Sequence, residues 1–126
     1  MKYVLAPADI TWKTFESPTS PGIGFGFTPS VIGSDYTDGF SAQLGRIGPG
    51  GRSKPHVDHY NHAFYFISGQ GEVTIGKRTW PLEPGTVVKI PTGLTHGFTN
   101  TGDDDLTFFV VYDPPYVAGG PFEEEA

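Results

Sequence analysis

The chain has 126 residues and a formal net charge of −6, from eight lysines and arginines against fourteen aspartates and glutamates. This length supports one domain with a single core, and the lack of a basic stripe argues against a nucleic-acid partner. Because there is no cysteine, neither disulfides nor thiolate metal ligands are available. Eighteen glycines, twelve prolines and eighteen aromatic residues favour many short strands over long helices.

The N-terminus shows no basic flank followed by a long apolar run, so we expect no secretory signal. The longest strongly apolar stretch, Leu106 to Tyr112, is far shorter than the roughly 20 residues that cross a bilayer. A cytoplasmic protein with no membrane partner is therefore expected.

Residues 1–39 are expected to form an N-terminal arm and the first strands of the domain. Three prolines within residues 6–22 predict an irregular segment there. From residue 40 onward, short apolar segments alternate with glycine and proline turns, which is typical of an antiparallel barrel or sandwich. The predicted strands are Phe40–Ile47, Ser53–Asp58, Ala63–Ser68, Glu72–Ile75, Thr86–Ile90, His96–Thr99 and Leu106–Tyr112.

The predicted core of the domain covers residues 40–113, and residues 114–126 are predicted to form an acidic C-terminal tail. This tail carries three consecutive glutamates, Glu123 to Glu125. A run of like charges at a terminus is typical of a solvated segment.

All four histidines of the chain lie in two places. His56, His59 and His62 fall within seven residues, and His96 follows downstream. Strand periodicity adds Asp58, because alternate residues of a strand share one face. Neutral imidazole and carboxylate groups are the usual ligands of divalent transition metals. The sequence therefore predicts one divalent transition-metal ion per chain.

The same periodicity groups apolar side chains with the histidines. If His62 opens a strand and faces inward, Phe64 and Phe66 follow it, and His96 takes Phe98 to the same face. The expected result is a polar cluster surrounded by phenylalanines, which describes a metal in an apolar substrate pocket.

Two arrangements of the ligands remain open at this stage. In the first, His56, Asp58, His62 and His96 together hold the ion. In the second, a local bulge turns His59 inward, and Asp58 orients a neighbouring imidazole without binding the metal. A third alternative is a degenerate site that binds metal weakly or not at all.

These residues resemble the two sequence motifs of the cupin superfamily, in its small single-domain form. The second motif is matched at every named position by Gly85-x5-Pro91-x-Gly93-x2-His96-x3-Asn100. The first motif is matched in spacing by Gly50-x5-His56-x-Asp58-x3-His62-x6-Gly69. Here aspartate stands where the family has its second histidine, and histidine stands where the family has glutamate.

The resemblance implies an all-β fold, a cupin-type antiparallel β-barrel or double-stranded jelly roll with one metal near its mouth. His56 and His96 match family ligands directly, and His62 is similar to the extra histidine of four-histidine manganese cupins and three-histidine cupin dioxygenases. Iron or manganese is therefore favoured, with nickel, copper or zinc as alternatives. Asp58 departs from both patterns. The resemblance also implies a homodimer.

Three imidazoles and at most one carboxylate leave open positions on the ion for a small, partly apolar or aromatic substrate. Gln43 on the first long strand is a further candidate for the substrate pocket. The leading hypothesis is a dioxygenase-type oxidoreductase, because the shell is similar to those of redox-active cupins. One alternative is a lyase or isomerase without redox chemistry, in which His59 or a tyrosine such as Tyr112 moves a proton. Another is a non-catalytic cupin that binds a small molecule.

Overall fold

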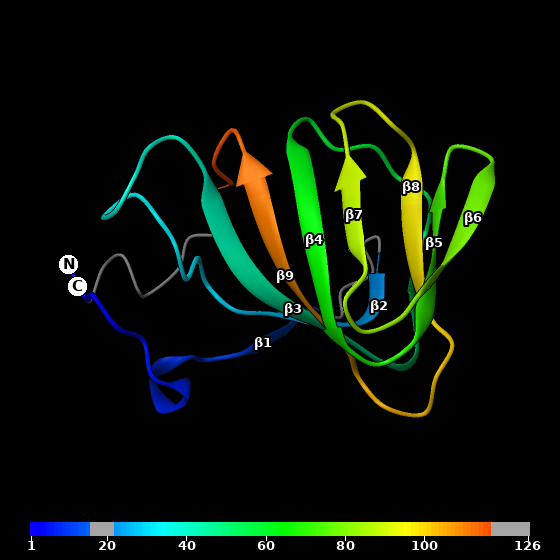
Figure 1. The fold of residues 1–126 in the computed structure, drawn as a ribbon, viewed down its shortest axis with the longest axis horizontal. Helices are drawn as coiled ribbons and strands as arrows, with labels where there is room; N and C mark the ends of the chain where they lie inside the picture. Colours follow the sequence, from blue (N-terminus) through cyan, green and yellow to red (C-terminus); the bar gives the residue numbers. More distant parts are fainter. Residues whose placement is uncertain (16–21, 117–126) are drawn as a thin grey trace.

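The computed structural model describes residues 1–15 and 22–116, which form a strongly curled antiparallel β-sheet (Figure 1). The strands are β1 (Lys13–Phe15), β2 (Gly22–Phe27), β3 (Ser41–Ser53), β4 (Asn61–Ser68), β5 (Gly71–Ile75), β6 (Arg78–Leu82), β7 (Val87–Ile90), β8 (His96–Asn100) and β9 (Leu106–Asp113). Within the described residues the helical structure is one short 3-10 turn, η1 (Pro7–Asp9). The predicted all-β fold is confirmed.

Seven strands follow one another across the sheet in the order β6-β5-β8-β3-β9-β4-β7, and β2 pairs with both β1 and β3. The long strand β3 is central, because it pairs with β2, β8 and β9. In the described part of the chain, no helix is long and apolar enough to cross a membrane. The glutamates of the predicted acidic tail lie outside the described residues.

Strand β3 runs through a glycine-rich segment that we expected to end it. Its first half pairs with β9, and beyond the bend Arg52 pairs with Thr99 of β8. Gly50 has a φ of 77°, and a Cβ on Gly51 would lie 2.7 Å from the carbonyl oxygen of Ile23. Because glycine tolerates both conditions, the strand bends here instead of stopping.

The predicted strand Ser53–Asp58 is wrong. Ser53 ends β3, and the chain then forms a loop up to β4 that makes one isolated bridge, between His56 and His96. Pro55 lacks the N–H group that a continuing ladder would need at that position.

β1 and β2 lie in the N-terminal region, where the first strands of the domain were expected without stated bounds. β6, between the predicted strands 72–75 and 86–90, was not predicted. β6 contains Pro81 and forms the end of the described strand order; an edge strand tolerates proline because one of its sides needs no ladder hydrogen bonds.

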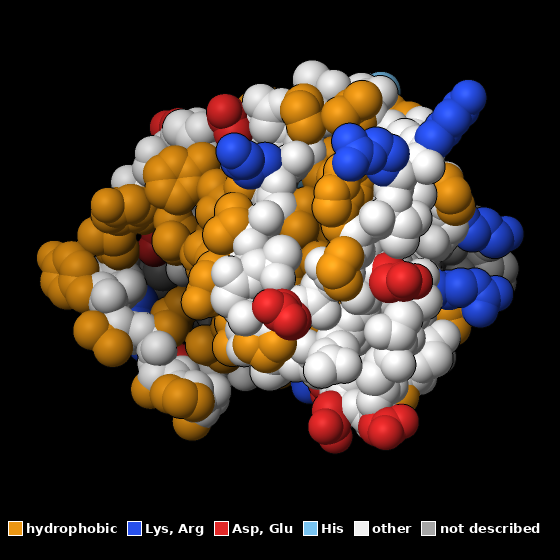
Figure 2. Space-filling view, turned by 45° about the vertical axis from the view of Figure 1, so that its right-hand side comes forward, with side chains coloured by type: hydrophobic (Ala, Val, Ile, Leu, Met, Phe, Trp, Pro, Cys, Tyr) orange, Lys and Arg blue, Asp and Glu red, His pale blue; other side chains and the backbone are white. Residues whose placement is uncertain are grey.

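The inner face of the curled sheet holds one apolar core rich in phenylalanine. Phe66 has no exposed surface, and its ring lies 5.4 Å from that of Phe108 between centroids. The remaining buried members are Phe25, Ile47, Phe64, Val73, Leu82, Val88, Ile90, Phe98, Leu106, Val110 and Tyr112. The outer surface is mixed: on the face in Figure 2, lysine and arginine side chains are scattered and form no stripe.

Gly69, at the end of the first motif, is expected to be intolerant of a side chain. Its φ is 89°, and a Cβ there would lie 2.7 Å from the Cα of Leu106. Gly69→Ala should therefore lower the free energy of unfolding by at least about 2 kcal/mol, because strain and a backbone clash add together. Gly76 is the matched control: its φ is 61° but nothing lies within 4 Å. Gly76→Ala should cost only about 1 kcal/mol. Urea denaturation measures the free energy of unfolding of both variants, and equal losses would show that the clash at Gly69 has no effect.

Candidate metal centre

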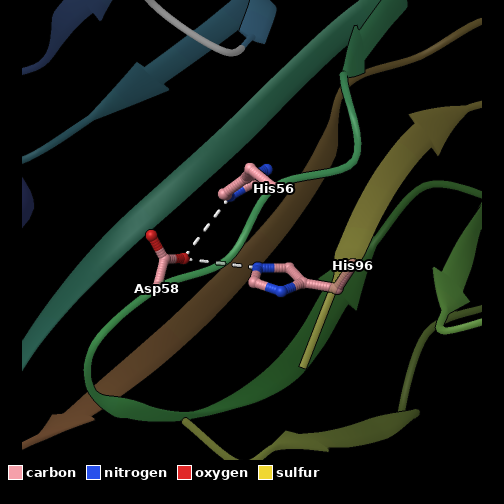
Figure 3. A group of neighbouring side chains, drawn as sticks. All are labelled: His56, Asp58 and His96. Carbon is pink, nitrogen blue, oxygen red and sulfur yellow. Dashed lines mark ion pairs between the residues drawn. The ribbon is translucent and has the colours of Figure 1, made fainter. Parts of the chain in front are cut away.

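Three imidazole nitrogens converge on one carboxylate oxygen. The Nε2 atoms of His56, His62 and His96 lie 3.4, 3.5 and 3.3 Å from Oδ2 of Asp58. Figure 3 shows His56 and His96 approaching Asp58 from different elements, the first from the loop before β4 and the second from the start of β8. His62 comes from β4. The fold thus brings together side chains that are up to 40 positions apart in the sequence.

Backbone hydrogen bonds hold two of these elements together. His56 and His96 donate to each other's carbonyl oxygens, both at 2.9 Å, so the two imidazoles start from neighbouring backbone positions. The carbonyl oxygen of Asp58 accepts from the backbone N–H of Gly93 and from the hydroxyl of Thr92, both at 3.2 Å. The turn between β7 and β8 therefore positions the loop that carries Asp58.

Hydrogen bonds at Nδ1 fix the tautomer and the ring orientation of His56 and His96. Nδ1 of His56 lies 2.8 Å from the carbonyl oxygen of Lys54, and Nδ1 of His96 lies 2.9 Å from that of Leu94. A carbonyl oxygen only accepts, so each Nδ1 carries the proton. In the neutral ring, Nε2 then offers its lone pair toward Asp58, which is the orientation a metal ligand needs.

The donor set fits a bound cation. Nε2 of His62 and Nε2 of His96 are buried and have no hydrogen-bond partner, although both lie near the Asp58 carboxylate. A buried lone pair that faces a carboxylate oxygen is unfavourable unless a positive charge lies between them. Two ligand atoms that each bind one ion at about 2.1 Å are separated by about 3.0 to 3.4 Å, close to the observed spacing.

Three of these residues place their ligand atoms closest together. One ligand atom each from His56, Asp58 and His96 lies within 4.8 Å of the others. His62 lies outside this compact group and joins it through its approach to Asp58. The three-residue group could hold a metal ion, with His62 as the next available donor.

Burial and neighbouring charges set the protonation states that metal binding requires. Burial alone would raise the pKa of Asp58, but polar contacts with His56 and His96 outweigh it and hold that pKa well below its ordinary value. Burial, reinforced by the nearby His96, lowers the pKa of His62 to about 4. At neutral pH the carboxylate is therefore ionised and His62 is neutral.

His56 behaves differently. Its interaction with Asp58 raises its pKa above the ordinary value of 6.5, and this effect outweighs partial burial. A proton therefore competes with a metal ion for His56 near neutral pH.

Aromatic rings enclose the histidines. The ring of Tyr60 lies 5.4 Å from that of His62, and Tyr112 lies 6.0 Å from it in a stacked arrangement. Phe64 and Phe98 pack beside His62 and His96 on the core side. Burial raises the pKa of both tyrosines, so the phenols stay protonated at neutral pH.

The predicted site residues outside the ligand set differ in burial. Phe66 is completely buried in the core, so it can shape a pocket only from behind. Gln43 is also buried, and its amide nitrogen donates to the carbonyl oxygen of Thr28 at 2.7 Å. His59 is exposed and does not belong to the group around Asp58. The roles predicted for His59, Tyr112 and Gln43 stay predictions.

Sequence reasoning missed Tyr60 and Thr92. Tyr60 precedes His62 by two positions, so the parity argument that linked His62 to Phe64 would have found it if extended one step into the loop. Thr92 fills the unspecified position of Pro91-x-Gly93, where the motif gives no signal.

Thr92→Val is expected to weaken metal binding about tenfold, because it removes the hydroxyl that holds the Asp58 carbonyl while the exposed side chain costs little stability. Thr92→Ser, which keeps the hydroxyl, is the matched control and should bind like the wild type. Competition with a chromogenic chelator measures both affinities. Equal affinity of the valine variant would show that the loop is held in place without this contact.

Comparison with known proteins adds the family context. A family model described as "Cupin domain" matches residues 43–112. The chain is 34% identical over 79 residues to "Polyketide synthase CurC" of Streptomyces cyaneus, across 62% of this chain and 49% of that protein. It therefore spans about half the length of that relative. It is 25% identical over 92 residues to "L-ectoine synthase" of Vibrio campbellii, across 72% and 71% of the two chains.

Among solved structures, the polyketide cyclase RemF from Streptomyces resistomycificus has the same fold. The TM-score is 0.76 at 24% sequence identity, and the match covers 99% of this chain and 93% of that one. The curled antiparallel sheet is thus a fold that occurs in solved proteins.

Proposed function

Because the chain belongs to the cupin domain family, we propose that it is a metal-dependent enzyme that rearranges a small, partly aromatic substrate without redox chemistry, as a cyclase, isomerase or lyase. The observation that carries this proposal is the convergence of three imidazole nitrogens on the Asp58 carboxylate beside a protonated tyrosine. The names of two relatives, a polyketide synthase and an ectoine synthase, support it, since neither describes an oxygenase.

In this proposal His56, His62, His96 and Asp58 hold a divalent ion. When bound, such an ion acts as a Lewis acid that polarises an oxygen of the substrate. Three neutral imidazoles and one carboxylate leave a net charge of about +1 on a divalent centre, which favours a substrate oxygen that gains negative charge during the reaction. An enolisable carbonyl compound has such an oxygen.

Tyr112 supplies the proton chemistry. Its ring stacks beside His62 in a nearly buried position, and its raised pKa keeps the phenol protonated. A protonated phenol next to the ligand set acts as an acid or a hydrogen-bond donor rather than as a base. The surrounding phenylalanines exclude water and so strengthen these polar interactions.

A dioxygenase is the second candidate function. It is favoured by the abundance of imidazole around Asp58, because neutral histidine-rich shells leave a redox-active ion with open positions. The two candidates differ in one requirement: only the dioxygenase consumes oxygen.

The experiment is turnover of small β-dicarbonyl and phenolic compounds by protein purified without chelator and loaded with zinc, nickel, manganese or iron. We expect turnover under strict exclusion of oxygen, and none with metal-stripped protein or with the His62→Ala variant. Oxygen uptake that tracks product formation would instead establish the dioxygenase. Metal-loaded protein that binds these compounds without converting them would indicate a non-catalytic cupin.

The expected homodimer and the cytoplasmic location stay predictions. Sedimentation velocity of the full chain tests the first of them.

A further inference from the structure

We infer that Tyr60, Tyr112 and Tyr116 form an aromatic wall that selects a flat, conjugated substrate whose oxygen faces the metal centre. This inference rests on the proposed function and specifies its substrate class. The three side chains are called the tyrosine wall below.

The three rings pack against one another in pairs. The centroids of Tyr60 and Tyr112 are 5.0 Å apart, those of Tyr112 and Tyr116 are 5.1 Å apart, and those of Tyr60 and Tyr116 are 5.5 Å apart. Tyr60 meets Tyr112 at 87°, edge to face. The wall also reaches the ligand set, because both Tyr60 and Tyr112 contact the ring of His62.

Three separate segments build the wall, and its outermost member is anchored. Tyr60 lies in the loop before β4, Tyr112 lies in β9, and Tyr116 follows β9. The backbone N–H of Tyr116 donates to Oγ of Ser41 at 2.8 Å, and the same hydroxyl lies 3.0 Å from the Tyr116 carbonyl oxygen. Because Ser41 is buried in β3, it holds the segment that carries Tyr116 against the sheet.

Exposure increases across the wall from Tyr112 through Tyr60 to Tyr116. The side chain of Tyr112 is 6% exposed and Tyr116 is 40% exposed, with Tyr60 half-buried between them. The wall therefore extends from a buried ligand to the protein surface. A substrate that reaches the ion from this side passes along tyrosine rings.

The chemistry of the wall indicates what it recognises. In the described residues, the ring contacts of the three tyrosines are with one another and with His62. The wall therefore offers ring contacts and phenol hydrogen bonds to a substrate. A charged group of the substrate binds at the metal centre instead. Aromatic faces and edges favour flat conjugated partners over saturated rings of equal size.

The test uses hydroxamates as probes, because each carries the same metal-binding group on a different body. Zinc-loaded protein is titrated calorimetrically with acetohydroxamate, benzohydroxamate and cyclohexanecarbohydroxamate. We expect benzohydroxamate to bind about tenfold more tightly than the cyclohexane compound, the effect of one to two aromatic contacts. Equal affinities of the two ring compounds would overturn the inference.

Variants then test whether the tyrosine wall causes the preference for the flat ring. Tyr60→Leu should abolish the preference for the flat ring while leaving zinc content and acetohydroxamate affinity unchanged, and Tyr60→Phe should keep it. Tyr65→Leu is the control, because Tyr65 is half exposed and lies on the opposite face of β4. If Tyr60→Leu does not fold, Tyr116→Leu at the exposed end of the wall replaces it. A retained preference in Tyr60→Leu, or in Tyr116→Leu where it stands in, would contradict the wall, whereas Tyr65→Leu should keep the preference.

The two proposals fail in different ways. Protein that binds neither zinc nor acetohydroxamate would refute the metal centre itself. Protein that binds both, but does not distinguish the flat ring from the saturated one, would refute only the tyrosine wall.

Discussion

Replacing His96 with alanine is expected to reduce metal affinity by at least about 100-fold, more than loss of a residue that only supports a ligand. His96 belongs to the compact three-residue group, and its backbone also pairs with that of His56. Removal of its imidazole therefore takes away a donor from the part of the site where the ligand atoms lie closest together. Metal content by mass spectrometry and chelator competition measure the loss.

The same substitution should leave the stability of the metal-free fold nearly unchanged. Truncating a buried side chain leaves a cavity, which costs about 2 to 3 kcal/mol for a residue of this size. The wild-type imidazole, however, buries an Nε2 atom with no hydrogen-bond partner, and such an atom costs about 1 to 3 kcal/mol. These two effects nearly cancel, and the lost hydrogen bond from Nδ1 to the Leu94 carbonyl oxygen costs about 1 kcal/mol, so urea denaturation should show the metal-free variant only about 1 kcal/mol less stable than the metal-free wild type. A variant that does not fold would contradict this balance.

His59→Ala is the matched control, since this exposed histidine lies three residues from His56 but outside the group around Asp58. Its metal affinity should equal that of the wild type. Loss of metal from this variant would show that the bulged arrangement, with His59 turned inward, forms when the ion binds.

The sequence predicted the site best where a regular strand carries it. In β4, buried and exposed residues alternate from His62 to Phe66, so counting by twos placed these side chains on one face. His96 and Phe98 in β8 are likewise two positions apart and both buried, although Gly97 between them is buried as well. Periodicity works in these strands because one face packs in the core and fixes the register.

Prediction failed where the chain leaves regular pairing. A Gly-Pro-Gly-Gly segment is compatible with either a turn or a bent strand, and only the partners of β3 on both sides of the bend decide between them. The position of Asp58 depends on hydrogen bonds from Thr92 and Gly93, which are more than 30 residues away. Tyr60 was missed because parity was counted forward from His62 and not back into the preceding loop. These features depend on non-local contacts that a single sequence does not display.

Asp58→Asn is expected to weaken metal binding about 100-fold at pH 7.5, because the loss of one negative charge beside a divalent ion costs roughly 3 kcal/mol even with substantial screening. Chelator competition with the zinc-loaded protein measures this. Affinity equal to that of the wild type would show that Asp58 only orients an imidazole. Asp58→Glu is the control that keeps the charge, and it should retain more affinity than the asparagine variant.

The pH dependence of this variant separates two opposing effects of the Asp58 charge. The carboxylate attracts the ion, but it also raises the pKa of His56, so that a proton occupies this ligand at pH values where an ordinary histidine is already free. In the wild type, affinity should therefore fall as the pH drops through the raised pKa of His56. In Asp58→Asn, that pKa moves down and the fall begins at lower pH. The gap between the two proteins should be widest at pH 7.5 and narrower at pH 6. Nuclear magnetic resonance titration of His56 in metal-free protein checks the cause: an unshifted His56 in the variant would mean that the carboxylate acts on the ion alone.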